Sequence, residues 1–480
     1  VRLVLDTDAA AGADPLRGIG AWSGVDLVAG VPPPEAPPNV LLVSIDTLRA
    51  DHLSLYGYAR PTTPAIDAWA KRSGVTFDNV VAPSPWTLPS HASLFTGWNA
   101  TRHGVNYDQS AVPGELVLLA EILRKAGWAT AAFTGGALLD PRFGFVQGFD
   151  RYRYWAAWEA PQSDELRSHV DRALRFLDEN APRPFFLFLH TYEVHTPYRK
   201  REPFFSRWSE SPSLAASVNF LRPEPPRAAN GFRVRETLVW ETGVAPRPLQ
   251  PDEVTTAVAM YDSAIAYADE QIGRLLHKLD ELGISDRTLV VLTSDHGELF
   301  GEHGEFGHYS LYDENLLVPL VISLPRKFGG GRRVTRQVRL VDVPVTILDL
   351  VGAPSLPEPD GTSLAPDLLG TKNDEGLDAW SYAASSNYGI ALRLADGSSY
   401  VFNNTVWRPD QANEEIRRPT STGISRGATR REHDIERLRG RARTELAGVP
   451  GLRVSFSNRE AAPLVGEIRG PVPPIAVKSD

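Results

Sequence analysis

The stretch Ser84-Pro85-Trp86-Thr87-Leu88-Pro89-Ser90-His91-Ala92-Ser93-Leu94-Phe95-Thr96-Gly97 runs from turn formers into a helical pattern. Pro89 suits the first turn of a helix, and Leu94 and Phe95 fall on one face. A hydroxyl just before a helix meets free backbone N–H groups and the positive end of the helix dipole, where an oxyanion or a phosphate is held. Thr87 is therefore the candidate nucleophile. The alternative interpretation is that Thr87 is only an N-cap.

Composition limits the classes of protein to which the chain can belong. At 480 residues the chain is longer than one hydrophobic core typically supports, so two or more subdomains are expected. An apolar content of 42% and a charged content of 23% are ordinary for a soluble globular protein. The net charge of -9 argues against a nucleic-acid partner. The arginine-rich run from Arg417 to Arg443 alternates with acidic residues and is interpreted as a solvated helix.

The absence of cysteine excludes disulfides, thiolate metal sites and a formylglycine derived from cysteine. No apolar run reaches the length of a membrane span, and the first residues given do not show the pattern of a signal peptide. Val1 is not a start methionine, so an N-terminal piece is expected to precede it, and a membrane anchor would lie there. We expect a bacterial protein outside the cytoplasm, either periplasmic, secreted or membrane-anchored.

The first part of the chain predicts a short N-terminal segment, a linker and then an α/β domain. Residues 1–30 are interpreted as the remnant of a preceding β segment, and residues 31–38 as a stiff proline-rich linker. Val40–Ile45 is a continuous apolar run typical of a buried parallel strand, and Asp46 follows at its carboxyl end. In open α/β sheets, ligands bind beyond the carboxyl ends of the strands. Asp46 is therefore a candidate site residue.

Two more buried strands carry polar residues at their carboxyl ends. Residues 184–189 deliver His190, and residues 288–293 end in Ser294-Asp295-His296-Gly297-Glu298. Helices are expected at 63–73, 116–126, 170–180, 254–282 and around 341–351. Strands alternating with helices predict an α/β fold with a mostly parallel sheet.

The remaining segments are assigned by composition and turn signals. Residues 199–250 are rich in proline, arginine and aromatics without a clean period, and are interpreted as a lid or insertion near the site. Residues 390–394 and 399–402 flank the turn at Asp396-Gly397, which predicts a hairpin. We therefore place a catalytic domain at 39–370 and a smaller C-terminal β-rich subdomain at 371–480.

Carboxylates and an imidazole at the strand ends suit a divalent metal of borderline hardness. Asp46, Asp295 and His296 would supply oxygen and nitrogen ligands, and Thr87 would complete the set. Zn or Mn is favoured over Ca or Mg. A metal that touches Thr87 would lower the pKa of its hydroxyl and polarise the substrate oxygen.

These motifs resemble those of the sulfatases within the alkaline phosphatase superfamily. The sulfatase signature is Cys or Ser, any residue, Pro, Ser, Arg, and then a small-residue helix that ends in Thr-Gly; here it begins at Thr87 and ends at Gly97. The resemblance covers about Asn39 to Asp367, with several motifs in the family's order. It implies an alkaline-phosphatase-like α/β core, with Asp46, Thr87, Asp295 and His296 around the nucleophile-side metal.

The chain departs from the sulfatase pattern at the nucleophile. Sulfatases oxidise Cys or Ser to an aldehyde, which threonine cannot give because its β-carbon carries a methyl group. Thr47 stands where sulfatases have a second Asp, His296 where they usually have Asn, and Thr134-Gly135-Gly136-Ala137-Leu138 lacks their sulfate-binding lysine. These departures favour the phosphatase and phosphodiesterase branch. A threonine hydroxyl attacks phosphorus and leaves a phosphothreonine that water or an alcohol cleaves.

The histidines supply candidates for acid–base chemistry and anion binding. His91 stands where sulfatases place the signature arginine, His195 matches their substrate-site histidine before a proline, and His308 falls where they have an anion-binding lysine. His190 and His303 are assigned to a second metal site or to the substrate. His103 is interpreted as structural.

The sequence therefore predicts a metal-dependent hydrolase or transferase of phosphate mono- or diesters. Its substrate would be a small-molecule, glycan-linked or lipid-linked ester, with no nucleic-acid partner. One alternative is a sulfuric ester hydrolase that acts without formylglycine. A second is a catalytically inactive homologue that binds a glycan or envelope partner and keeps the metal structurally.

Overall fold

The computed structural model describes residues 36–106, 110–155, 164–210, 250–308, 310–371, 376–383, 387–396, 399–405, 413–420, 423–426 and 440–441. The expected β-segment remnant at 1–30 and most of the expected linker at 31–38 lie outside these residues. So does most of the expected lid, of which residues 199–210 and 250 are described. The domain boundaries drawn from the sequence stay a prediction.

An eight-stranded sheet forms the centre of the fold, in the order β10-β2-β9-β6-β1-β5-β3-β4. Only β9 runs antiparallel to its neighbours, β2 and β6, so the mostly parallel sheet expected from the sequence is confirmed. The strands are β1 (Asn39–Ile45), β2 (Val75–Val81), β3 (Ala129–Thr134), β4 (Arg151–Tyr154), β5 (Phe185–Thr191), β6 (Thr288–Thr293), β9 (Leu320–Ser323) and β10 (Arg332–Arg339).

The three central strands are fully buried, as their apolar runs predict. Every residue of β1, β5 and β6 is buried, because helices cover both faces of the sheet. The sequence reading missed β2 and β10, which pair with each other in parallel and carry polar residues. In β10, a buried position is occupied by Arg336, which pairs with Asp367, so the strand does not show an apolar pattern in the sequence.

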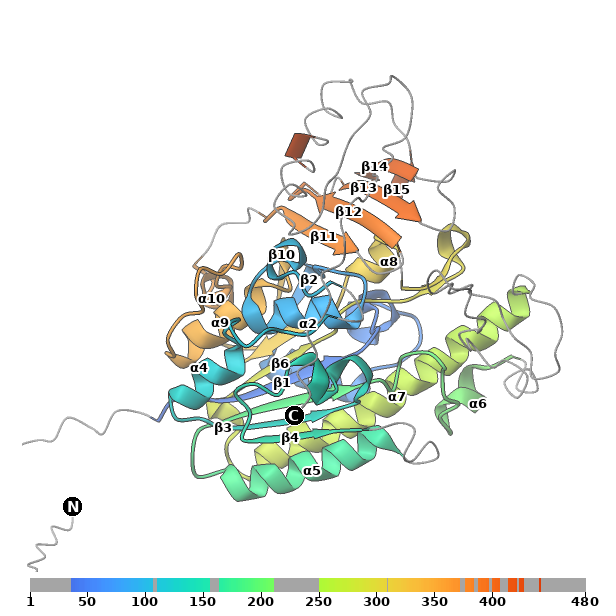
Figure 1. The fold of residues 1–480 in the computed structure, drawn as a ribbon. Helices are drawn as coiled ribbons and strands as arrows, with labels where there is room; N and C mark the ends of the chain where they lie inside the picture. Colours follow the sequence, from blue (N-terminus) through green and yellow to red (C-terminus); the bar gives the residue numbers. More distant parts are fainter. Residues whose placement is uncertain are drawn as a thin grey trace, which may run out of the picture. The chain divides into compact units, whose positions relative to one another are not determined.

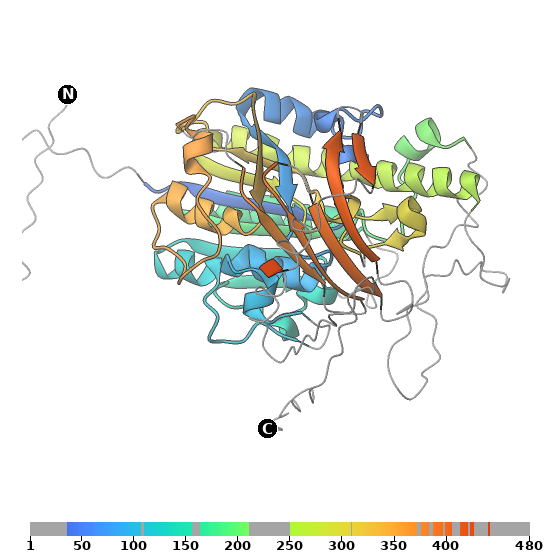
Figure 2. The same cartoon turned by 90° about the horizontal axis from the view of Figure 1, so that it is seen from above.

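Helices pack on both faces and divide the core in two (Figures 1 and 2). One core lies under α1 (Pro64–Ser73), α5 (Glu165–Asn180) and α7 (Pro251–Glu281). The other lies under α2 (Thr87–Thr96), α4 (Leu119–Lys125) and α9 (Asp342–Val351). All five helices expected from the sequence are confirmed, although α5 begins five residues before the expected start.

Short elements complete the described part of the chain. The helices are α3 (Ala100–His103), α6 (Phe204–Trp208), α8 (Asp313–Leu316) and α10 (Ala365–Leu368). The 3-10 turns are Ala50–His52, Ser54–Tyr56, Ala137–Leu139, Pro141–Phe143, Ser285–Arg287 and Glu302–Gly304, and β7 (Leu299–Phe300) pairs with β8 (Phe306–Gly307). Among the described helices, none is long and apolar enough to cross a membrane.

A smaller antiparallel sheet follows the main domain, as expected. Its strands are β11 (Ala379–Ala383), β12 (Asn387–Arg393), β13 (Ser399–Thr405), β14 (Asn413–Thr420) and β15 (Gly423–Arg426). The predicted hairpin is β12–β13. The solvated helix expected from Arg417 onward is wrong for the start of that run, because Arg417 pairs with Ser399 on β13 and the chain continues into β15.

The small sheet reaches the loop that precedes the signature helix. The Ser381 hydroxyl donates to the Ala82 carbonyl at 2.6 Å, and the backbone N–H of Tyr382 donates to the Pro83 carbonyl at 2.9 Å. Gln337 on β10 donates to two carbonyls of the small sheet region. The C-terminal strands therefore brace the approach to Thr87.

Leu187 on β5 tests the buried sheet. Its side chain is fully buried in the core under α5, so we expect Leu187→Ala to lower the free energy of unfolding by about 2–5 kcal/mol. The matched control is Leu369→Ala, because Leu369 is 51% exposed and its loss should change stability by less than about 0.5 kcal/mol. Chemical denaturation measures both, and similar losses in the two variants would contradict this account of the core.

Candidate active site

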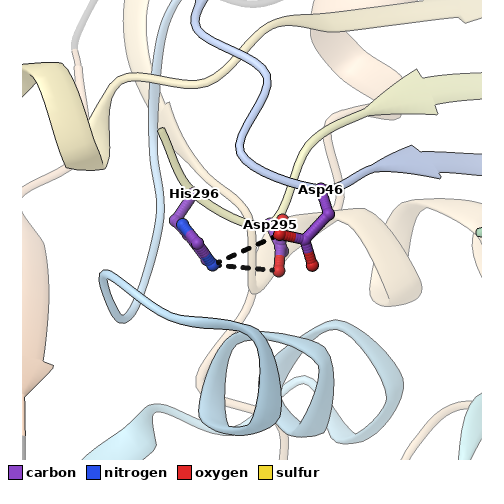
Figure 3. Close-up of side chains that lie close together, drawn as sticks. All are labelled: Asp46, Asp295 and His296. Carbon is purple, nitrogen blue, oxygen red and sulfur yellow. Dashed lines mark ion pairs between the residues drawn. The ribbon is translucent and has the colours of Figure 1, made fainter. Parts of the chain in front are cut away.

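Two neighbouring strands bring the predicted metal ligands together. β1 and β6 pair in parallel, so Asp46 and Asp295 emerge at the same edge of the sheet. Asp46, Asp295 and His296 offer ligand atoms that all lie within 4.8 Å of one another, and all three residues are buried (Figure 3). The His296 Nε2 atom lies 3.4 Å from Asp295 Oδ2 and 3.8 Å from Asp46 Oδ1.

The two carboxylates lack enough protein partners for their charge. Asp46 Oδ1 and Asp295 Oδ2 are buried without a hydrogen-bond partner in the described part of the chain. Burial raises the pKa of Asp46, and burial together with the nearby Asp46 raises the pKa of Asp295 well above its usual range. Such a pair is stabilised in its charged form by a cation between the oxygens.

The orientation of His296 also fits a metal ion. Its Nδ1 atom donates to the Gly297 carbonyl at 2.9 Å, which leaves Nε2 as a bare lone pair facing the carboxylates. Burial lowers the pKa of His296 well below its usual value, so the ring stays neutral. Two carboxylates and one imidazole therefore fit a divalent cation of borderline hardness.

Thr87 points into this cluster from helix α2. Its Oγ1 atom donates to Asp46 Oδ2 at 3.1 Å and lies 3.5 Å from His296 Nε2. The expectation that Thr87 precedes the helix is wrong, because it is the first residue of α2 and Trp86 is the cap. Ser90, one turn further on, donates to the Asp295 carbonyl at 2.7 Å and fixes the helix against β6.

His91 and His190 support the cluster from within the protein. His91 is fully buried, and its Nδ1 atom lies 2.9 Å from the Thr87 carbonyl and 3.4 Å from Asp295 Oδ2. Burial lowers its pKa to about 4. His190 Nε2 donates to Asp46 Oδ2 at 3.3 Å, and burial lowers its pKa to about 3. Both rings are therefore neutral and orient the residues around Thr87.

His195 and His308 lie beside one another at the site. Their ring centroids are 5.0 Å apart, and the His308 ring is 4.6 Å from that of His296. The His308 Nδ1 atom contacts Glu298 Oε1 at 3.1 Å, and Glu298 is fully buried. Glu298 thus orients His308, a role that the sequence reading did not assign although Glu298 stands two residues after His296.

The other candidate histidines lie elsewhere. His303 contacts Glu314 at 3.1 Å and stacks on Tyr312, whereas His190 contacts Asp46. The structure therefore does not bring His190 and His303 together as a second group of ligands among the described residues. His103 is buried and bonded to Ser93 at 3.0 Å, in agreement with its structural interpretation.

Tyr192 is a site residue that the sequence reading missed. Its ring packs edge-on against His190 and His195, and its hydroxyl interacts with Thr87. Burial and the carboxylates Asp46 and Asp295 raise the pKa of Tyr192 well above its usual value, so the phenol stays a hydrogen-bond donor. Gly135 makes room for it, because a Cβ at that position would lie 2.5 Å from the ring. Nothing in the sequence motifs singles this tyrosine out.

Glu165 at the start of α5 anchors the end of β5. Its Oε2 atom accepts from the Thr191 hydroxyl at 3.0 Å, next to His190. Its Oε1 atom has no hydrogen-bond partner among the described residues and lies 3.5 Å from His169 Nε2. Burial, with a smaller contribution from Glu193, raises the pKa of Glu165 to about 8.

Comparison with known proteins gives one family. The family model described as Sulfatase matches residues 38–353. The ulvan-active sulfatase of Formosa agariphila is 28% identical over 342 residues, which cover 68% of this chain and 63% of that protein. The multifunctional alkaline phosphatase superfamily protein PehA of Trinickia caryophylli is 26% identical over 69% of this chain and 77% of its own length.

Solved structures agree with the fold. The phosphonate monoester hydrolase of Agrobacterium radiobacter superposes with a TM-score of 0.65 at 22% identity, over 86% of this chain and 95% of that one. The alkaline-phosphatase-like architecture expected from the sequence is thereby confirmed.

Metal binding tests the carboxylate pair. In protein stripped by a chelator, Mn or Zn should stabilise the wild type by about 2.7 kcal/mol at a hundredfold excess over Kd, measured by thermal denaturation. Asp295→Asn should abolish this gain, and without metal it should be at least as stable as the wild type because a buried charge is removed.

The matched control is Glu314→Gln, which changes the carboxylate beside His303 and should leave metal stabilisation intact. A loss of metal stabilisation in Glu314→Gln that equals the loss in Asp295→Asn would contradict the site defined by Asp46, Asp295 and His296.

Glu165 gives a prediction about pH. Its pKa rises from about 4.5 to about 8 on folding, so its contribution is fully present below pH 4.5 and is lost as pH rises toward 8. The loss is at most about 1.4 kcal/mol per pH unit. Glu165→Gln should remove this slope, so the variant gains stability relative to the wild type between pH 5 and 8 in denaturant titrations. Parallel pH profiles for the two proteins would refute the assignment.

Proposed function

We propose that this chain, which belongs to the sulfatase family, is a metal-dependent ester hydrolase that uses Thr87 as its nucleophile and prefers phosphate mono- or diesters. The observation that carries the proposal is the position of the Thr87 hydroxyl. It donates to one oxygen of Asp46, while the other oxygen of Asp46 has no hydrogen-bond partner in the described part of the chain and lies 3.8 Å from His296 Nε2. A hydroxyl held in this way is oriented for attack and has an acceptor for its proton.

The chain's own residues provide the parts of a two-step displacement. Thr87 Oγ1 attacks phosphorus and gives its proton to Asp46 Oδ2, while His308 protonates the leaving oxygen as the ester P–O bond breaks. Water, or an alcohol in a transferase, then attacks phosphorus and gives its proton to His308. The bond from phosphorus to Thr87 breaks, and Thr87 takes back its proton from Asp46.

Asp46, Asp295 and His296 would hold the divalent cation. When bound, the cation supplies positive charge that lowers the pKa of the Thr87 hydroxyl and polarises the substrate oxygen. His195 and the neutral phenol of Tyr192 would donate hydrogen bonds to the oxygens of the transferred group. These donors would take the place of the lysine that sulfatases use and this chain lacks at 134–138.

His91 acts in this scheme as a positioning residue, because its ring is fully buried and contacts the Thr87 carbonyl and Asp295 from below the site. The substrate would be a small-molecule, glycan-linked or lipid-linked phosphate ester. The expected location outside the cytoplasm stays a prediction.

A sulfuric ester hydrolase is the second candidate. It is favoured by the ulvan-active sulfatase and other relatives with sulfatase names. Such an enzyme would have to work without formylglycine, since the nucleophile position holds threonine. The third candidate, a binding homologue with a structural metal, predicts metal-dependent stability without turnover.

The substrate class is tested with four 4-nitrophenyl esters: phosphate, phosphodiester, phosphonate and sulfate. With Mn or Zn restored, we expect the phosphoesters to be turned over fastest. Thr87→Ala should lower this rate by roughly a thousandfold or more, because the covalent step is lost. Thr87→Ser, which keeps the hydroxyl, should retain a measurable part of the rate.

Two outcomes would oppose the proposal. Sulfate turnover that persists in Thr87→Ala would indicate attack by water in a sulfatase. Absence of turnover in the folded, metal-loaded wild type on all four esters would favour the binding homologue or a transferase that requires its own acceptor.

A further inference from the structure

A cleft of about 390 Å³ lies between the edge strand β4 and helix α5, and its lining is dominated by arginine. The lining residues are Phe133, Arg151, Arg153, Arg172, Arg175 and Glu179. The cleft is therefore lined by four guanidinium groups and one carboxylate, although the net charge of the whole chain is -9.

Strand and helix periodicity bring these arginines to one place. Arg151 and Arg153 are two residues apart on β4, so both point to the same face of the sheet. They pair in register with Ala131 and Phe133, which belong to the core under α5. On α5, Arg172 and Arg175 are three residues apart and share one face of the helix.

The positive charge of the cleft is only partly compensated. Arg151 donates to Glu179 at 2.8 Å. Within the described ranges, Arg153, Arg172 and Arg175 form no ion pair, and Arg172 Nη1 is buried without a hydrogen-bond partner. The charge of Arg172 also adds to burial in lowering the pKa of His169, one turn away, to about 3. The cleft is therefore lined by about three positive charges, those of Arg153, Arg172 and Arg175, that no carboxylate of the described residues compensates.

Protection of the sheet edge explains only part of this arrangement. Charged side chains on an edge strand prevent pairing with another sheet, and Arg151 and Arg153 serve that purpose. Arg172 and Arg175 lie on a helix, where no edge needs protection. Their convergence on the same cleft indicates a ligand.

The cleft is separate from the candidate active site. Thr87 belongs to α2, which packs on the sheet face opposite α5. The arginines of the cleft belong instead to α5 and to β4, the strand that ends the sheet next to β3 (Figure 1 shows both elements). An anion in this cleft would therefore not occupy the position of the ester that Thr87 attacks.

We propose that this arginine cleft binds a small anion of up to disaccharide size that carries two or more sulfate or phosphate groups. Arginine forks bind such oxoanions through paired hydrogen bonds. The volume falls in the usual range for small-ligand sites, about 300–1,000 Å³. Two or more anionic groups match the uncompensated charge of Arg153, Arg172 and Arg175.

Isothermal titration calorimetry on the full chain tests the cleft, with methylene diphosphonate and a disulfated disaccharide as probes. All proteins carry Thr87→Ala so that no probe is turned over. Arg153→Gln/Arg172→Gln should weaken binding of at least one probe by roughly tenfold or more, with affinity falling as salt is raised. The probe that binds more tightly identifies the phosphorylated or the sulfated source.

The matched control is Arg72→Gln/Arg124→Gln, which removes the same charge from side chains that are 61% and 57% exposed and paired elsewhere. It should bind both probes as the parent does. The proposal is overturned if neither probe binds the parent, or if the control loses as much affinity as the cleft variant. Because binding is measured without turnover, the result is independent of the proposed hydrolase activity.

Discussion

The site depends on one electrostatic constraint, the burial of two carboxylates at the ends of adjacent strands. Asp46 and Asp295 leave β1 and β6 at the same sheet edge, and among the described residues each has an oxygen without a hydrogen-bond partner. Their carboxylate oxygens lie within 4.8 Å of each other, and two buried anions this close repel each other unless a cation or a proton lies between them. The surrounding residues are arranged around this charge. His296 turns the lone pair of Nε2 toward Asp46 Oδ1 and Asp295 Oδ2, and Thr87 donates to the other oxygen of Asp46, Oδ2.

The scaffold holds these groups with bonds to the backbone. Ser90 ties α2 to the Asp295 carbonyl, and His91 ties the Thr87 carbonyl to the Ser44 hydroxyl on β1. Arg49 reaches from the loop after β1 to the Glu298 carbonyl at 2.9 Å, which joins the two loops that carry the candidate metal ligands Asp46 and Asp295. Thr87, Asp46 and His308 therefore have fixed relative positions before any substrate arrives.

The sequence predicts the parts of the fold in which burial and periodicity agree. The apolar runs of β1, β5 and β6 locate the central strands and therefore Asp46 and Asp295. The strands β2 and β10 escape this reasoning because polar residues interrupt their apolar pattern: Asp78 and Asn79 in β2, and Arg336 in β10, which pairs with Asp367. All ten residues of α2 are buried, so its periodicity does not show that His91 points inward. The contact between Glu298 and His308 depends on tertiary folding of a loop, as does the position of Tyr192.

The most direct test of the Thr87 mechanism is to trap the covalent intermediate. Metal-loaded protein is mixed with a 4-nitrophenyl phosphoester, quenched with acid within the first turnover, digested and analysed by mass spectrometry. The account predicts one phosphoryl group on the peptide that contains Thr87, and none in Thr87→Ala. Turnover of the ester with Thr87 unmodified at every time point, under conditions where product forms in a burst, would contradict it.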